Sequence, residues 1–149
     1  MHFFGAAGTV TGSKFLLELP GINILIDCGV FQGLKELRLE NWKDLPFPAS
    51  QIDLVLLTHG HLDHCGYLPR LVKQGFKGQI RGTSPSLAVA GVILEDSAKI
   101  HEEEAESANA ESYTKHEPAL PYFTLEEAEN SMRLFKSIEP ETWYRSEER

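Results

Sequence analysis

Three histidines and one aspartate lie within six consecutive positions, in the segment Thr58-His-Gly-His-Leu-Asp-His64. Imidazole nitrogens and carboxylate oxygens are ligands that suit Zn²⁺, and a catalytic zinc keeps one coordination position open for water. His59, His61, Asp63 and His64 are therefore the candidate metal ligands. Two such ions about 3.5 to 4 Å apart can share one hydroxide and lower the pKa of water from 15.7 towards roughly 7, so the pattern predicts a hydrolase.

The apolar run Asp53-Leu-Val-Leu-Leu57 precedes this segment and predicts a central strand that is covered on both faces. Histidines two positions apart on a continuing strand would point to opposite faces, so the chain must leave the strand if both are to bind one metal. Gly60 supplies the freedom to do so. The aspartate and the third histidine then fall at the turn into the next helix, where they can reach a second metal.

Asp27 ends a second β-rich run, Ile22 to Asp27, which pairs with Lys14 to Leu19 through a tight turn at Pro20-Gly21. We expect these two runs to form a hairpin. A carboxylate at the end of the second run can orient a ligand imidazole, as metal sites usually require. The alternative is an ordinary turn residue, because aspartate is common where strands end.

The rest of the chain alternates helix and strand signals. Helical spacing runs from Tyr67 to Val72 and stops at Gly75, and Gln79 to Thr83 is typical of a strand. Ser84-Pro85 predicts an N-cap and first turn of a long helix. Its expected buried stripe comprises Leu87, Ala90, Leu94, Ala98, Ala105 and Ala108.

A second helix is expected from Thr124, whose spacing to Glu127 fits a capping box. Its expected buried face comprises Leu125, Ala128, Met132 and Phe135. The predicted order, three strands, a helix, a strand and two helices, indicates one α/β layered domain.

The net charge of −8 is unevenly distributed. Residues 1–90 carry eight Lys or Arg against seven Asp or Glu, whereas residues 91–149 carry six against fifteen. Acidic surface repels a phosphate backbone, so the chain alone does not have the positive charge that is typical of nucleic-acid binding. The two cysteines, Cys28 and Cys65, indicate reduced thiols in a cytoplasm, and no stretch has the length and apolarity of a membrane helix.

Three further signals are weaker. The glycines between Gly5 and Lys14 do not have the spacing of a phosphate-binding loop, and we expect a tight loop near the metal site. Cys65 follows a candidate ligand but is expected to be a small buried residue. His101 and His116 are alternative ligands, with helix packing or an exposed loop as the simpler interpretation.

The motif THGHLDHCG resembles the THxHxDHxG signature of the metallo-β-lactamase superfamily, and LIDCG resembles the aspartate motif that precedes it. Within that superfamily, GAAGTVTGSKFLLEL, LIDCGVFQG, EDSAKI and YTKHEPALPYFT resemble the bacterial β-CASP ribonucleases and the mRNA 3′-end processing endonucleases. These stretches run from about residue 5 to residue 137.

The resemblance implies an αββα sandwich with a two-zinc site that cuts RNA phosphodiester bonds as an endonuclease and sometimes as an exonuclease. By position, His59 and His61 would bind the first zinc, and Asp63 and His64 the second. Asp27 would be the supporting aspartate, and Asp63 would also handle the proton of the nucleophile. A cytoplasmic protein with an RNA substrate, no membrane partner and possible homo-oligomers is expected.

The family also uses a further histidine, a bridging aspartate and an inserted β-CASP domain, for which residues 1–149 hold no counterpart. We therefore expect the N-terminal part of a catalytic domain, inactive by itself. Two alternatives stay open at this point. One is a two-zinc hydrolase of a small thioester or lactone, like glyoxalase II, and the other is a non-catalytic fragment that acts as an interaction module.

Overall fold

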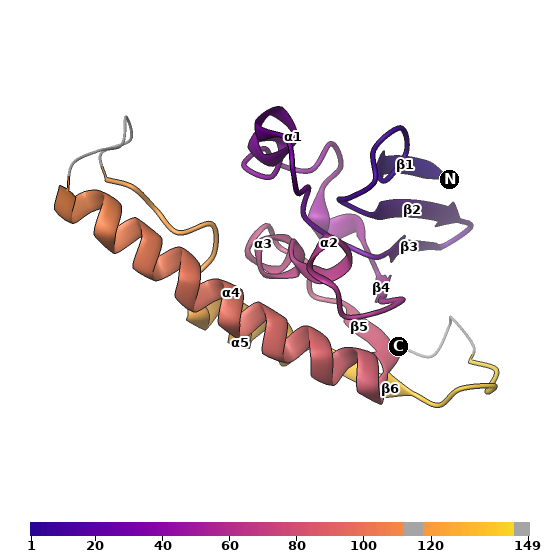
Figure 1. The fold of residues 1–149 in the computed structure, drawn as a ribbon. Coiled ribbons are helices and arrows are strands. Elements are labelled where there is room, and N and C mark those ends of the chain that lie inside the picture. The colour runs from indigo at the N-terminus through magenta and orange to yellow at the C-terminus, as the bar shows by residue number, and fades with distance from the viewer. Residues whose placement is uncertain (112–117, 145–149) are drawn as a thin grey trace.

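A computed structural model describes residues 1–111 and 118–144, which form a six-stranded mixed sheet (Figure 1). In chain order the strands are β1 His2–Gly5, β2 Lys14–Leu19, β3 Ile22–Ile26, β4 Leu54–Leu56, β5 Gln79–Thr83 and β6 Phe135–Ile138, and each pairs with the next. Strands β1 to β3 are antiparallel, whereas β3 to β6 are parallel. The carboxyl ends of β3 and β4 therefore lie at the same edge of the sheet, which brings Asp27 beside Thr58.

The helices are α1 Lys35–Glu40, α2 Leu62–Cys65, α3 Leu68–Lys73, α4 Ser84–Glu111 and α5 Leu125–Met132, with a 3₁₀ turn at Ala49–Gln51. Figure 1 shows α2 and α3 between the strands and α4, and the second half of α4 extending beyond the sheet. Among the described residues, none of these helices is long and apolar enough to cross a membrane.

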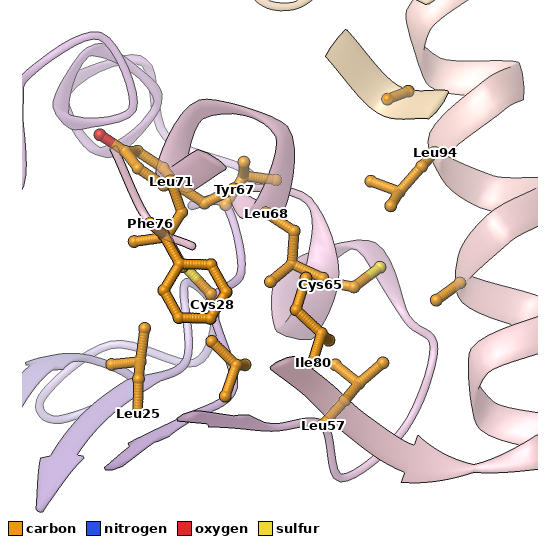
Figure 2. Close-up of a cluster of buried hydrophobic side chains, with 14 of the residues drawn as sticks. Leu25, Cys28, Leu57, Cys65, Tyr67, Leu68, Leu71, Phe76, Ile80 and Leu94 are labelled. Atoms are coloured by element: carbon orange, nitrogen blue, oxygen red, sulfur yellow. The ribbon is translucent and has the colours of Figure 1, made fainter. Parts of the chain in front are cut away.

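The core lies between one face of the sheet and the helices. Leu25, Val55 and Ile80 occupy paired positions on β3, β4 and β5, and all three are fully buried. Figure 2 shows Leu68 of α3 and Leu94 of α4 gathered with Leu25 and Ile80 in this cluster. All six residues of the stripe predicted for the long helix are buried, so that prediction is confirmed.

The opposite face of the sheet is only partly covered. Val55 of β4 is fully buried, whereas its neighbours Leu54 and Leu56 point to the other side and are half-buried. Among the described residues, the helices pack on the side of Val55. The prediction that this strand is covered on both faces is therefore wrong. The predicted α/β class is confirmed.

Several local predictions need correction. Phe135 is not on the second helix but begins β6, where it pairs with Ile80, because α5 ends at Met132. The capping box of Thr124 and Glu127 at the start of α5 is confirmed. At the start of α4, Ser84 is already helical, and the hydroxyl of Thr83 lies 3.4 Å from the amide of Ser86 in the place of a cap. Strand β1 and helix α1 were not predicted.

Candidate metal centre

The segment with the candidate ligands begins where β4 ends. Thr58 to His61 leave the strand as predicted, and His61 is the N-cap of α2, which carries Asp63 and His64. Gly60 acts differently from the prediction, because its φ is not positive. A Cβ there would lie 2.7 Å from the amide nitrogen of Ala90, so the glycine instead allows α4 to pack directly against the segment.

His59 and His61 present two nitrogens at the spacing of a shared ion. Nε2 of His59 lies 3.2 Å from Nδ1 of His61. Two nitrogens that are each about 2.0 to 2.1 Å from a tetrahedral zinc lie about 3.3 to 3.4 Å apart, so the pair fits one zinc without rearrangement. The ring of His64 is also close, with its centroid 3.9 Å from that of His59.

The tautomer of His59 follows from its neighbour Thr58. The Thr58 hydroxyl lies 2.8 and 2.9 Å from the two carboxylate oxygens of Asp27 and 3.1 Å from Nδ1 of His59. A hydroxyl has one proton, which goes to the carboxylate, so its oxygen accepts a hydrogen bond from Nδ1–H of His59. Nε2 of His59 then keeps a lone pair for a metal.

His64 is oriented by Asp27 in the same way. Its Nδ1 lies 2.7 Å from Oδ2 of Asp27, so Nδ1–H donates to the carboxylate and Nε2 is left with the lone pair. That Nε2 lies 3.6 Å from Oδ2 of Asp63. Asp63 and His64 therefore form a second pair of candidate ligands, beside the pair of His59 and His61.

Asp27 is an internal support and not a free ligand. It is 2% exposed and has a φ of +58°, a backbone conformation that is uncommon outside glycine. Its carboxylate accepts hydrogen bonds from the amide of Thr58 at 2.8 Å and from the hydroxyl of Ser13 at 3.4 Å, in addition to those from Thr58 Oγ1 and His64. These contacts leave it no open side towards a metal.

Backbone hydrogen bonds hold the loop after β3 against α2. The amide of Cys28 donates to the carbonyl of His64 at 2.8 Å, and the amide of Tyr67 donates to the carbonyl of Cys28 at 2.8 Å. The amide of Ser13 donates to the carbonyl of Asp63 at 2.9 Å. The loop between Gly5 and Lys14 therefore lies at the site, as predicted, and it contributes backbone and hydroxyl contacts through Ser13.

Burial and neighbouring groups shift the pKa of two residues at this site, His59 and Cys65. Desolvation and the neighbouring imidazoles of His64 and His61 lower the pKa of His59, which favours its neutral, ligand form. Burial raises the pKa of Cys65 to about 12, and its thiol lies 3.4 Å from the carbonyl oxygen of Gly60. Cys65 is thus a buried neutral thiol, as predicted.

His101, the further candidate ligand among the described residues, does not join the cluster. His101 lies on α4 and packs edge-on against Tyr122 and Phe123, with ring centroids 5.8 and 5.1 Å away. His116 lies outside the described residues. Sequence reasoning missed the roles of Thr58 and Ser13, although the position of Thr58 directly before the histidines was a usable signal.

Within the parts of the chain that the structure describes, no group of three or more His, Cys, Asp or Glu side chains is arranged to hold a single metal ion. The geometry explains why, because the four candidate ligands form two pairs. A catalytic zinc usually has three protein ligands. Each pair would therefore need a further ligand from outside it.

Comparisons with known proteins agree with this chemistry. Residues 7–137 match the sequence model of the metallo-beta-lactamase superfamily. Ribonuclease TTHA0252 of Thermus thermophilus is 36% identical over 142 residues, which cover 95% of this chain and 28% of that protein. Transcription termination factor FttA of Methanocaldococcus jannaschii is 26% identical and covers 90% of this chain and 22% of that protein.

A third relative is Cleavage and polyadenylation specificity factor 73 of Drosophila melanogaster. It is 40% identical over 97 residues, which cover 64% of this chain and 14% of that protein. The chain thus spans less than a third of the length of each of these three relatives.

Proposed function

Because this chain belongs to the metallo-β-lactamase superfamily, we propose that it is the N-terminal part of the catalytic domain of a zinc-dependent β-CASP ribonuclease. The observation that carries the proposal is the arrangement of His59, His61, Asp63 and His64 as two pairs braced by Asp27. RNA is preferred to a small thioester because the relatives named above include a ribonuclease and a cleavage factor. The β-CASP insertion and the C-terminal part of the domain would lie outside residues 1–149.

In this proposal His59 and His61 would hold one zinc, and Asp63 and His64 would hold a second, because each pair lies close together. Bound zinc supplies Lewis acidity to a phosphoryl oxygen and acidifies water. Asp63 accepts the proton of the attacking water, and Asp27 keeps the imidazole of His64 in the ligand tautomer. The remaining ligands would come from sequence outside this chain.

We further propose that the protein works in the cytoplasm on RNA, as an endonuclease and in some settings as an exonuclease, with no membrane partner. Self-association into homo-oligomers is part of the same proposal. The charge of −8 does not attract a phosphate backbone. Binding of RNA therefore has to rely on local cations and on metal, and should weaken as salt rises.

Two measurements test the proposal. The first is the zinc content and zinc affinity of a polypeptide that continues to the length of the relatives, compared for the native sequence, His59→Ala and Asp63→Ala. The second is cleavage of a labelled RNA by a polypeptide that continues to the length of the relatives. We expect each substitution to weaken zinc binding and to reduce cleavage at least about 100-fold, since loss of catalytic groups costs that much or more.

His2→Ala is the matched control, because His2 is an exposed histidine on β1 that contacts Glu18 and lies outside the cluster. It should leave zinc binding and cleavage unchanged. Full cleavage by both ligand variants, or equal zinc affinity in all four proteins, would show that the cluster is not a catalytic metal centre.

A further inference from the structure

A hollow of about 730 Å³ lies beside the candidate metal centre. It is lined by the chain after β3, by α1, by the second half of α4 and by residues 119–123, and Leu62 of α2 forms part of its wall. Its volume falls within the roughly 300 to 1,000 Å³ that is usual for small-molecule sites. We call it the aromatic hollow, after Phe31, Trp42 and Tyr122 in its lining.

Trp42 lines this hollow with an aromatic side chain that is partly exposed and has contacts that hold it in place. The residue is 49% exposed. The guanidinium of Arg70 lies over the indole at 5.7 Å and also donates to the Trp42 carbonyl at 3.2 Å, while Tyr122 meets the indole edge-on at 5.4 Å. Arg70 and Tyr122 therefore hold the ring, and the exposed part of Trp42 can contact a planar group.

Two buried polar atoms of the lining residues have no hydrogen-bond partner within the described part of the chain. They are Nδ1 of His101 and Oη of Tyr122. Buried polar groups are nearly always satisfied, and an unsatisfied one costs about 1 to 3 kcal/mol. A ligand with hydrogen-bonding edges would supply the missing partners once the side chains that cover these two atoms move, because neither atom is open to the hollow in this structure.

The charges at the hollow favour an anion. Lys35 and Arg38 line it and are exposed, and neither forms a salt bridge among the described residues. Glu104 is the carboxylate among the described lining residues. Among the described lining residues, two cations therefore stand against one carboxylate, in a chain whose net charge is −8.

We propose that the aromatic hollow is a base-binding subsite for single-stranded RNA, in which a nucleobase stacks on Trp42 and its phosphates meet Lys35 and Arg38. The proposal rests on the proposed function and deepens it, because Leu62 places the hollow directly beside the segment of candidate ligands. An apolar peptide would leave both cations and both buried polar atoms without partners. A nucleotide offers phosphates to the two cations and hydrogen-bonding edges to the two polar atoms, and aromatic stacking is the usual way in which proteins hold unpaired bases.

The test is the affinity of the zinc-free chain for a labelled RNA of five adenylates, compared with the same backbone without bases. Fluorescence anisotropy gives the Kd. We expect Trp42→Leu to raise the Kd for the adenylate RNA about 5- to 150-fold, which corresponds to one lost base–aromatic stack. The Kd for the abasic backbone should not change. Trp143→Phe is the matched control, since Trp143 is fully exposed and does not line the hollow.

Tyr122→Phe is the second variant, because it removes only the buried hydroxyl and keeps the ring packing of Tyr122. We expect a several-fold weaker affinity for the adenylate RNA with unchanged circular dichroism. Absence of RNA binding at millimolar concentration, equal binding of the abasic backbone, or equal affinity of Trp42→Leu and the native chain would overturn the subsite. So would a second copy of the chain that occupies the hollow, seen as a dimer that dissociates in Trp42→Leu.

The outcomes separate the subsite from the proposed function. RNA cleavage with the same KM in Trp42→Leu and the native sequence would refute the subsite while the ribonuclease stands. Base-dependent binding that is lost in Trp42→Leu, in a protein that neither binds zinc nor cleaves RNA, would support the subsite and refute the ribonuclease.

Discussion

Replacement of Asp27 by asparagine changes one atom of the carboxylate and should act on zinc binding through His64. In the native chain Oδ2 of Asp27 accepts from Nδ1–H of His64 at 2.7 Å, which leaves Nε2 free for a metal. An amide NH₂ in that place donates to Nδ1 instead. The ring proton then moves to Nε2, and His64 loses the lone pair that a metal requires.

The alternative amide orientation is also unfavourable. It keeps an oxygen towards His64 but turns NH₂ towards the amide of Thr58, which now donates to Asp27 at 2.8 Å. Two buried donors would then face each other, at a cost of about 1 to 3 kcal/mol. Since neither orientation satisfies every partner, we expect a lower melting temperature and a zinc Kd that is about 10- to 100-fold higher, the usual effect of losing a group that orients a ligand.

Zinc affinity is measured by competition with a chromophoric chelator, and stability by thermal denaturation without zinc. Asp53→Asn is the matched control, because Asp53 is exposed, precedes β4 and accepts from the amide of Asn23 at the opposite edge of the sheet. It should not alter zinc affinity. A zinc Kd in Asp27→Asn equal to that of the native chain would refute the assigned tautomer of His64.

Two further predictions concern the packing around the site. Gly29→Ala would place a Cβ 1.7 Å from the carbonyl oxygen of Asp63, so we expect the free energy of unfolding, measured by urea denaturation, to fall by more than about 2 kcal/mol. Gly91→Ala on α4 is the control, because its Cβ would meet only the flexible side chain of Met132 at 3.2 Å. It should change the free energy of unfolding by less than about 1 kcal/mol. Burial raises the pKa of both Cys28 and Cys65 to about 12, so the two thiols stay protonated and should resist iodoacetamide at pH 8.5 until urea unfolds the chain. Rapid labelling of the folded chain, detected by mass spectrometry, would contradict this.

The elements with a strong local signal were predictable from sequence. The hairpin of β2 and β3 has a Pro-Gly turn between β-rich runs, α4 has its apolar residues at helical spacing, and α5 has a capping box. Membership of the metallo-β-lactamase superfamily is likewise confirmed, and the relatives named above include a ribonuclease and a cleavage and polyadenylation specificity factor. The assignment of individual site residues stays a prediction.

The missed elements lack such a signal. Strand β6 begins at Phe135, which continues the apolar spacing of α5, and only its pairing with Ile80 of β5 makes it a strand. Strand β1 is four residues long and pairs with β2 through an irregular register between Phe3 and Gly5. Helix α1 has no buried residue, so no apolar stripe marks it.

The sequence by itself determined which side chains could bind a metal, because ligand chemistry and the spacing of His59, His61, Asp63 and His64 are local properties. Only the tertiary structure decided which ring nitrogen of His59 and of His64 keeps its lone pair. That depends on Asp27 and Thr58, which are 31 positions apart and meet because β3 and β4 are parallel neighbours that end at the same edge. The tertiary structure also shows that Gly60 allows α4 to pack closely against the segment. The sequence around Gly60 could not predict this, because the contact is with a helix that is distant in the chain.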